Sequence, residues 1–143
     1  MKPLRKHLEL IALLLSLLLF STGCSKDDDA TFFTPPSWIQ GDWIITSHEY
    51  LYPNLNGFEF TNNDFIMVND EYRESQNLFL NSVSGNAVYA TEQFSANNYI
   101  ISMHYILTTQ VYDFTPISAS EISCSYKDID YPENVKNVIL TRR

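Results

Sequence analysis

The sequence predicts a mainly β protein, a small antiparallel up-and-down barrel of about eight strands with one short helix. Three features lead to this fold class. Short runs are rich in β-branched and aromatic side chains, often alternating with polar ones. Clusters of Asn, Asp, Pro, Gly and Ser separate these runs, as turns between strands do. Helix signals are few, and a hydrophobic content of 45% is that of a globular chain rather than a disordered one.

The first expected strand, residues 42–51, begins directly after a turn. Gly41-Asp42-Trp43 supplies the turn, and a β-branched and aromatic run follows it. The polar residues 62–64 fit a tight hairpin turn, and residues 53–57 fit a longer one. The complete set of expected strands is 42–51, 58–61, 65–68, 87–94, 99–107, 110–114, 121–126 and 137–141.

Residues 70–84 do not alternate like the other segments. Leu78, Phe79 and Val83 have roughly helical spacing, and Gly85 suits the position just past a helix end. We therefore expect one short helical piece in this segment.

The first 23 residues are expected to be a secretory signal peptide. The N-terminus is basic, and the apolar run at 8–20 is too short to span a bilayer as a helix. Small residues then precede a cysteine in the sequence Ser21-Thr22-Gly23-Cys24. This resembles a bacterial lipobox, in which the cysteine is acylated and holds the protein to the membrane. The alternative is an ordinary secretory signal followed by an incidental cysteine.

Residues 24–36 are expected to be a lipidated acidic tether, and residues 37–143 a single barrel domain. Lys26 and the aspartates at 27–29 resemble the lysine-plus-acidic export signal of Bacteroidetes lipoproteins. That resemblance implies anchoring through Cys24 in the bacterial outer membrane, with exposure on the cell surface. A periplasm-facing anchor and a plain solvated tail are the alternatives.

The domain itself resembles the small lipocalin-like lipoproteins of bacteria. The resemblance rests on short motifs across residues 38–143: the Gly-x-Trp start at 38–43, the pair 57–61 and 64–66, and the segments 112–114, 121–122 and 140–142. It implies a lipocalin-like (calycin) barrel with a short helix after the third strand. The body is shorter than a typical lipocalin, which argues against a deep cavity.

The two C-terminal arginines are candidates for closing the base of the barrel. In a closed antiparallel barrel the last strand pairs with the first, which places Arg142 or Arg143 near Trp43. The lipocalin family closes its base with an arginine over this tryptophan. The alternative is that both arginines are simply solvated.

No residue pattern points to catalysis or to a metal. His48 and His104 lack nearby partner ligands, so no metal site and no cofactor are expected. No Gly-x-Ser-x-Gly elbow is present, and Cys124 fits a buried position in a strand. A net charge of −8 without a basic stripe argues against nucleic-acid binding. We expect a non-catalytic protein; an enzyme using paired carboxylates is the minor alternative.

Aromatic residues on the expected strands are the strongest functional signal. They can line a cup for a small apolar ligand, or they can simply fill a small barrel, which the size of the body favours. The candidate lining residues are Trp43, Phe58, Phe60, Phe65, Met103, Tyr105, Tyr112 and Phe114. The expected function is therefore a surface lipoprotein that binds a small apolar ligand. The alternative is an interaction module with a filled barrel that contacts an outer-membrane protein or a glycan.

Overall fold

The computed structural model describes residues 31–83 and 87–143, and Cys24 and the signal peptide lie outside this range. The described residues form nine strands and one short helix. The elements are β1 (Gly41–Ile45), β2 (Leu55–Phe60), β3 (Phe65–Asn69), β4 (Arg73–Ser75), α2 (Gln76–Ser82), β5 (Tyr89–Ser95), β6 (Asn98–His104), β7 (Thr109–Pro116), β8 (Glu121–Asp128) and β9 (Lys136–Arg142).

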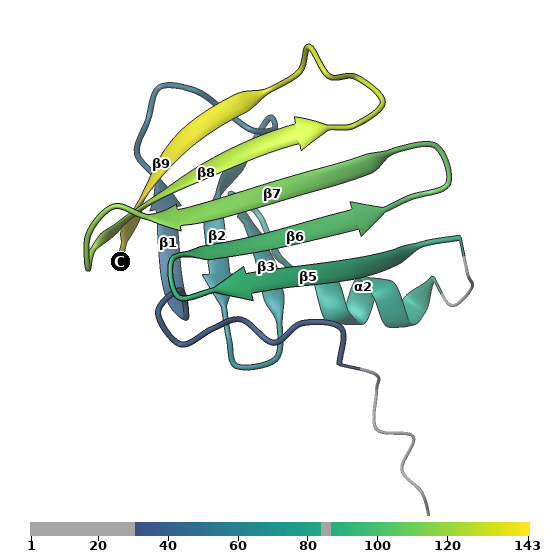
Figure 1. The fold of residues 1–143 in the computed structure, drawn as a ribbon, viewed down its shortest axis with the longest axis horizontal. Helices are drawn as coiled ribbons and strands as arrows, with labels where there is room; N and C mark the ends of the chain where they lie inside the picture. Colours follow the sequence, from purple (N-terminus) through teal and green to yellow (C-terminus); the bar gives the residue numbers. More distant parts are fainter. Residues whose placement is uncertain (1–30, 84–86) are drawn as a thin grey trace, which may run out of the picture.

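The strands form one antiparallel sheet in the order β4-β3-β2-β1-β9-β8-β7-β6-β5, which curls into a half-barrel (Figure 1). This confirms the predicted mainly β, up-and-down fold with one short helix. The last strand pairs with the first, and Trp43 lies directly opposite Arg142. The two edge strands, β4 and β5, do not pair with each other, so the sheet is open on this side.

The first strand ends earlier than the sequence predicts. The strand β1 ends at Ile45, and one more backbone bond follows, from the Thr46 amide to the Ile139 carbonyl at 2.9 Å. Beyond Thr46, polar side chains take over the bonds to β9. The Ile139 amide donates to Ser47 Oγ at 3.2 Å, and the Asn137 amide donates to Glu49 Oε2 at 3.1 Å. The loop that follows turns at Asn54, which has a positive φ of 66°. Because polar side chains bond the β9 backbone in place of main-chain groups, residues 47–54 are free to form a loop.

The ambiguous segment holds both a strand and the helix. Residues 73–75 pair with β3 as an additional strand, which the sequence analysis did not predict because three residues carry too little alternation. Ser75 then starts α2 as its N-cap: its hydroxyl accepts a hydrogen bond from the Leu78 amide at 3.1 Å. The helix ends at Ser82 with Val83 as its C-cap, close to the expected position.

Aromatic rings fill one half of the barrel, which we call the base. Phe58 is completely buried, and its ring centroid lies 5.3 Å from that of Phe65 and 5.5 Å from that of Phe114. Phe60 stacks on Phe65 with centroids 5.4 Å apart. Such contacts at ring-to-ring distances leave no room for a ligand, so the base is a packed core.

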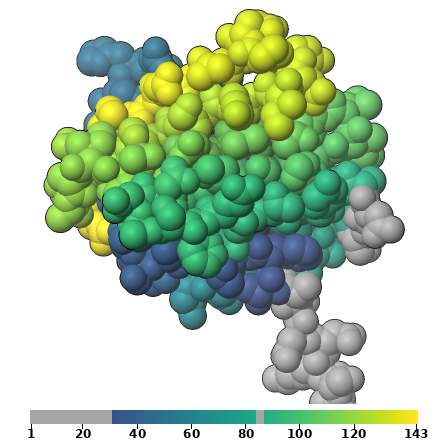
Figure 2. Space-filling view, viewed as in Figure 1, coloured from purple at the N-terminus to yellow at the C-terminus, as the bar shows by residue number. Residues whose placement is uncertain are grey.

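The segment before β1 covers the open side of the sheet. The Phe32 amide donates to Asn77 Oδ1 on α2 at 2.9 Å, and the Thr34 amide donates to Glu92 Oε1 on β5 at 2.9 Å. Between them, Phe33 is completely buried, with its ring 5.9 Å from that of Phe65. Figures 1 and 2 show this segment running along β5. The packed body therefore begins before residue 37, because the gap between β4 and β5 needs an apolar side chain to seal it.

A candidate ligand-binding pocket at the barrel mouth

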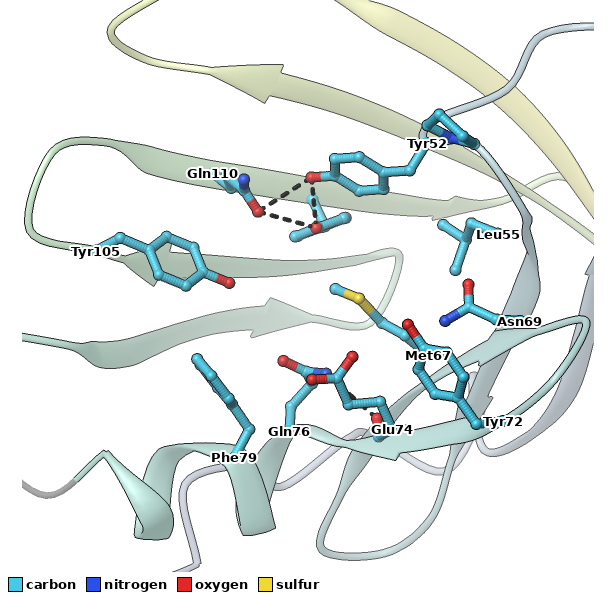
Figure 3. A pocket seen from close by; sticks show the side chains of 12 residues that line it. Tyr52, Leu55, Met67, Asn69, Tyr72, Glu74, Gln76, Phe79, Tyr105 and Gln110 are labelled. Atoms are coloured by element: carbon cyan, nitrogen blue, oxygen red, sulfur yellow. Dashed lines mark hydrogen bonds between the residues drawn. The ribbon is translucent and has the colours of Figure 1, made fainter.

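A pocket of about 250 Å³ opens at the end of the barrel opposite the packed base. We call it the mouth pocket. It lies among the inward-facing side chains of β2, β3, β4 and β7, the start of α2, and the loops after β1, β3 and β6. Its lining residues are Tyr52, Pro53, Leu55, Met67, Asn69, Tyr72, Glu74, Gln76, Phe79, Tyr105, Gln110 and Tyr112 (Figure 3).

Three side chains form a hydrogen-bonded wall on one side of the mouth pocket (Figure 3). The Tyr52 hydroxyl lies 2.8 Å from that of Tyr112 and donates to Gln110 Oε1 at 3.0 Å. The Tyr52 ring also meets the edge of Tyr126, with centroids 5.1 Å apart. These contacts fix the loop after β1 against β7 and β8, so this wall is held in place without a ligand.

The phenols of the pocket are neutral hydrogen-bonding groups. Burial raises the pKa of Tyr112 and of Tyr52 well above the ordinary value. Burial, and then the negative charge of Glu74, raise the pKa of Tyr105 to about 12. Near neutral pH these hydroxyls therefore keep their protons and can both donate and accept hydrogen bonds.

The opposite wall comes from β4 and α2. Gln76 is only 3% exposed, and its Nε2 donates to the Glu74 carbonyl at 3.2 Å. Phe79 packs against Tyr105 with ring centroids 6.3 Å apart. Figure 3 shows Glu74, Gln76 and Phe79 facing Tyr105 and Gln110 across the pocket. The pocket thus combines amide, hydroxyl and carboxylate groups with aromatic side chains.

The structure divides the eight candidate lining residues between two places. Tyr105 and Tyr112 line the mouth pocket. The other six lie in the buried core and do not line it: Trp43, Phe58, Phe60, Phe65, Met103 and Phe114. Their rings and side chains pack against one another rather than around a space.

Sequence reasoning missed most of the pocket lining. Met67 and Gln110 share the inward face of their strands with predicted core residues, so alternation carried a signal for them. Glu74 and Gln76 lie in the segment whose structure was ambiguous. Tyr52 follows directly after the expected strand 42–51, at a position for which no element was predicted. Loops and short strands carry little periodicity, which is why these positions were not found.

At the base, Arg142 covers Trp43. The Arg142 Cζ lies 4.6 Å from the Trp43 ring centroid, and its Nη2 donates to the Trp38 carbonyl at 2.9 Å. The indole Nε1 of Trp43 donates to the Ile39 carbonyl at 2.6 Å. Arg143 is exposed and contributes its backbone amide, which donates to the Asp42 carbonyl at 2.9 Å. Of the two arginines considered from the sequence, Arg142 makes the contact with the tryptophan.

The remaining candidate groups lie outside the mouth pocket. His104 stacks on Tyr89 with ring centroids 4.2 Å apart, on the outer face of the sheet. Cys124 is buried in β8, and burial raises the pKa of its thiol well above the ordinary value. Within residues 31–83 and 87–143, no group of three His, Cys, Asp or Glu side chains is placed to hold a metal ion.

Comparisons with protein-family models, with curated proteins and with solved structures found no match for this chain. In the described part of the chain, no helix has the length and apolar character needed to cross a membrane.

Proposed function

We propose that this protein is a surface-anchored, non-catalytic lipoprotein with a lipocalin-like half-barrel that binds a small ligand in the mouth pocket. The observation that carries the proposal is the pocket itself: a space of about 250 Å³ in which polar groups converge from β7 on one side and from β4 and α2 on the other. Binding sites for small molecules combine an apolar lining with a few placed polar groups in this way. Since the base is filled, the ligand is small rather than a long lipid.

The anchor rests on the sequence around Cys24. The first described residue, Thr31, lies beside Asp64 and Leu78, on the flank of the barrel, and does not line the mouth pocket. A tether that leaves from the flank keeps the mouth accessible. A Cys24→Ala variant should leave the membrane fraction of the cell, and retention in that fraction would refute the anchor. Removal of the acidic run at 27–29 should abolish labelling by an antibody added to intact cells.

Ligand binding is tested by native mass spectrometry of the full-length protein, purified gently from its own host. The expected result is a bound small molecule of defined mass. A Tyr105→Leu variant should lose it, because this side chain forms part of the pocket wall. The matched control is Leu107→Ala, since Leu107 is 86% exposed two residues away and does not line the pocket. Equal loss in both variants, or no bound molecule in any preparation, would contradict the proposal.

A second candidate function is a protein- or glycan-interaction module, and the rim of the mouth favours it. Loop residues around the mouth expose large apolar or aromatic side chains: Tyr50, Tyr72, Ile106, Leu107, Ile129 and Tyr131. Exposed aromatic side chains can stack on sugars or contact a protein. A glycan array probed with the full-length protein and with an Ile106→Ser, Leu107→Ser double variant tests the glycan form of this candidate. Binding that is equal in both proteins would refute a role for this loop.

A further inference from the structure

Glu74 is the one carboxylate that lines the mouth pocket. Successive residues of a strand point to opposite faces, so Glu74 faces inward while its neighbour Arg73 faces outward. Arg73 is held there by two carboxylates of the outer face, Asp42 at 3.1 Å and Glu59. These are the only ion pairs among the described residues, and the Glu74 carboxylate takes part in neither. The nearest residue in sequence that could neutralise it is therefore engaged on the other side of the sheet.

No cationic side chain lines the mouth pocket. The inward-facing lysine of β9, Lys136, donates from Nζ to the Leu51 carbonyl at 2.8 Å and is not part of the lining. An adjoining pocket shares Pro53, Asn69 and Tyr72 with the first and adds the carboxylates Asp70 and Glu71. Among the described residues, no cationic side chain lines the mouth pocket to compensate the negative charge of Glu74. The electric field of this charge attracts cations from solution.

Aromatic side chains share the mouth pocket with this charge. Tyr52, Tyr72, Phe79 and Tyr105 line the pocket together with Glu74. Aromatic rings attract cations through their negative faces, most strongly where water is excluded. The hydroxyl of Tyr105 and the amide oxygen of Asn69 can also accept hydrogen bonds from an ammonium group. An aromatic wall beside a half-buried carboxylate is a surrounding that favours a positively charged organic group over a neutral one.

We propose that the mouth pocket takes a small organic cation, a protonated amine or a quaternary ammonium compound, with its charge held by Glu74 and its apolar part against the aromatic side chains. This inference rests on the proposed function and adds the chemical class of the ligand. At about 250 Å³ the pocket suits a molecule of head-group size. A metal ion is not favoured, because Glu74 is the single acidic ligand in the lining.

The test compares charged probes with neutral molecules of the same shape, titrated onto the full-length protein by isothermal calorimetry. The pairs are choline with 3,3-dimethylbutan-1-ol, and 2-phenylethylamine with 2-phenylethanol. At least one cation should bind about tenfold or more tightly than its neutral counterpart. Added salt should weaken the binding of the cation and leave the binding of the neutral molecule unchanged. If neither cation binds more tightly than its counterpart, the inference is overturned. Binding of the alcohols would then still support a ligand-binding function, whose own test is the mass measurement above.

Matched variants identify the carboxylate responsible. Glu74→Gln should lower the affinity for the cation by about tenfold or more and leave the affinity for the alcohol unchanged. Glu71→Gln removes the same charge from the adjoining pocket, so it is the control and should change the affinity by less than about threefold. Equal effects of the two variants would assign the preference to the general field of the mouth and overturn the role of Glu74. Because the Glu74 carboxylate makes no ion pair, we expect Glu74→Gln to fold normally, which its unfolding curve checks.

Discussion

Replacing Phe58 by Ala distinguishes a packed barrel from a ligand cavity. The Phe58 side chain is completely buried. Its ring lies within contact distance of four others, with centroids 6.2, 5.3, 6.1 and 5.5 Å from those of Phe60, Phe65, Tyr112 and Phe114. If these contacts form a core, the variant loses them whether or not any ligand is present.

The expected loss is large. Truncating a buried Phe to Ala costs about 3–5 kcal/mol, and the number of ring contacts places Phe58 toward the upper end. A domain of this size has a total stability of roughly 5–15 kcal/mol, so this one change removes a substantial share of it. The melting temperature should fall by roughly 12–20 °C, at about 4 °C per kcal/mol. Urea unfolding followed by the fluorescence of the buried Trp43 measures the free energy directly.

The matched control is Phe94→Ala. Phe94 lies on the edge strand β5 and is 61% exposed, so its loss should cost less than about 1 kcal/mol. The reasoning fails if Phe58→Ala unfolds within about 1 kcal/mol of the unmodified protein with an unchanged denaturant slope. In that case Phe58 would border a space rather than a core, and the base of the barrel would again be a candidate for the ligand.

Three further changes test other parts of the fold. Arg142→Ala should lower the free energy of unfolding by about 1–2 kcal/mol, because it removes the cation from the face of Trp43. The control Arg143→Ala should change this free energy by less than about 0.5 kcal/mol, and equal effects of the two variants in urea denaturation would contradict the prediction. Stability should fall as the pH rises above 10, because burial raises the pKa of several tyrosines, that of Tyr105 to about 12 and those of Tyr52 and Tyr112 further, so the folded protein keeps protons that the unfolded chain releases. Tyr105→Phe removes one of these groups and should reduce the slope of the unfolding free energy between pH 10 and 12 without abolishing it; an unchanged slope would refute this. Gly57→Ala should cost about 1–3 kcal/mol or more, because its Cβ would lie 1.9 Å from the Trp43 carbonyl oxygen; a melting temperature equal to that of the unmodified protein would show that the strands can separate freely here.

Alternation predicted which side of a strand faces inward, but it could not predict how deep a residue lies along the barrel. Phe114 and Gln110 lie on the same face of β7. Phe114 is completely buried among rings at the base, whereas Gln110 lines the mouth pocket. Depth depends on how the strands curl and on which loops close over each end. These are long-range properties that no single segment encodes, so the inward-facing aromatic residues were predicted, but of the pocket lining only Tyr105 and Tyr112 were.

The parts of the chain that sequence reasoning placed least well are those that border the open side of the sheet. Here β4 is only three residues long, and α2 leads from it toward the other edge. Phe33, which lies in a segment expected to be a tether, packs against the core that this gap leaves uncovered. An apolar residue in a short segment that ends in two prolines carries no periodic signal. Its burial follows from the gap between β4 and β5, which is a property of the whole sheet.

The open edge also accounts for the position of the candidate site. In a fully closed barrel, a paired strand would continue where β4 ends and α2 begins. The inward-facing side chains of such a strand would be expected to be apolar rather than a carboxylate and a buried amide. Because pairing stops after three residues, Glu74 and Gln76 face the interior from a strand end and a helix start. The packed base supplies stability, and the incomplete edge supplies polar groups that a filled barrel lacks. Substitutions in the base should therefore change unfolding without changing ligand preference, and substitutions at Glu74 should do the reverse.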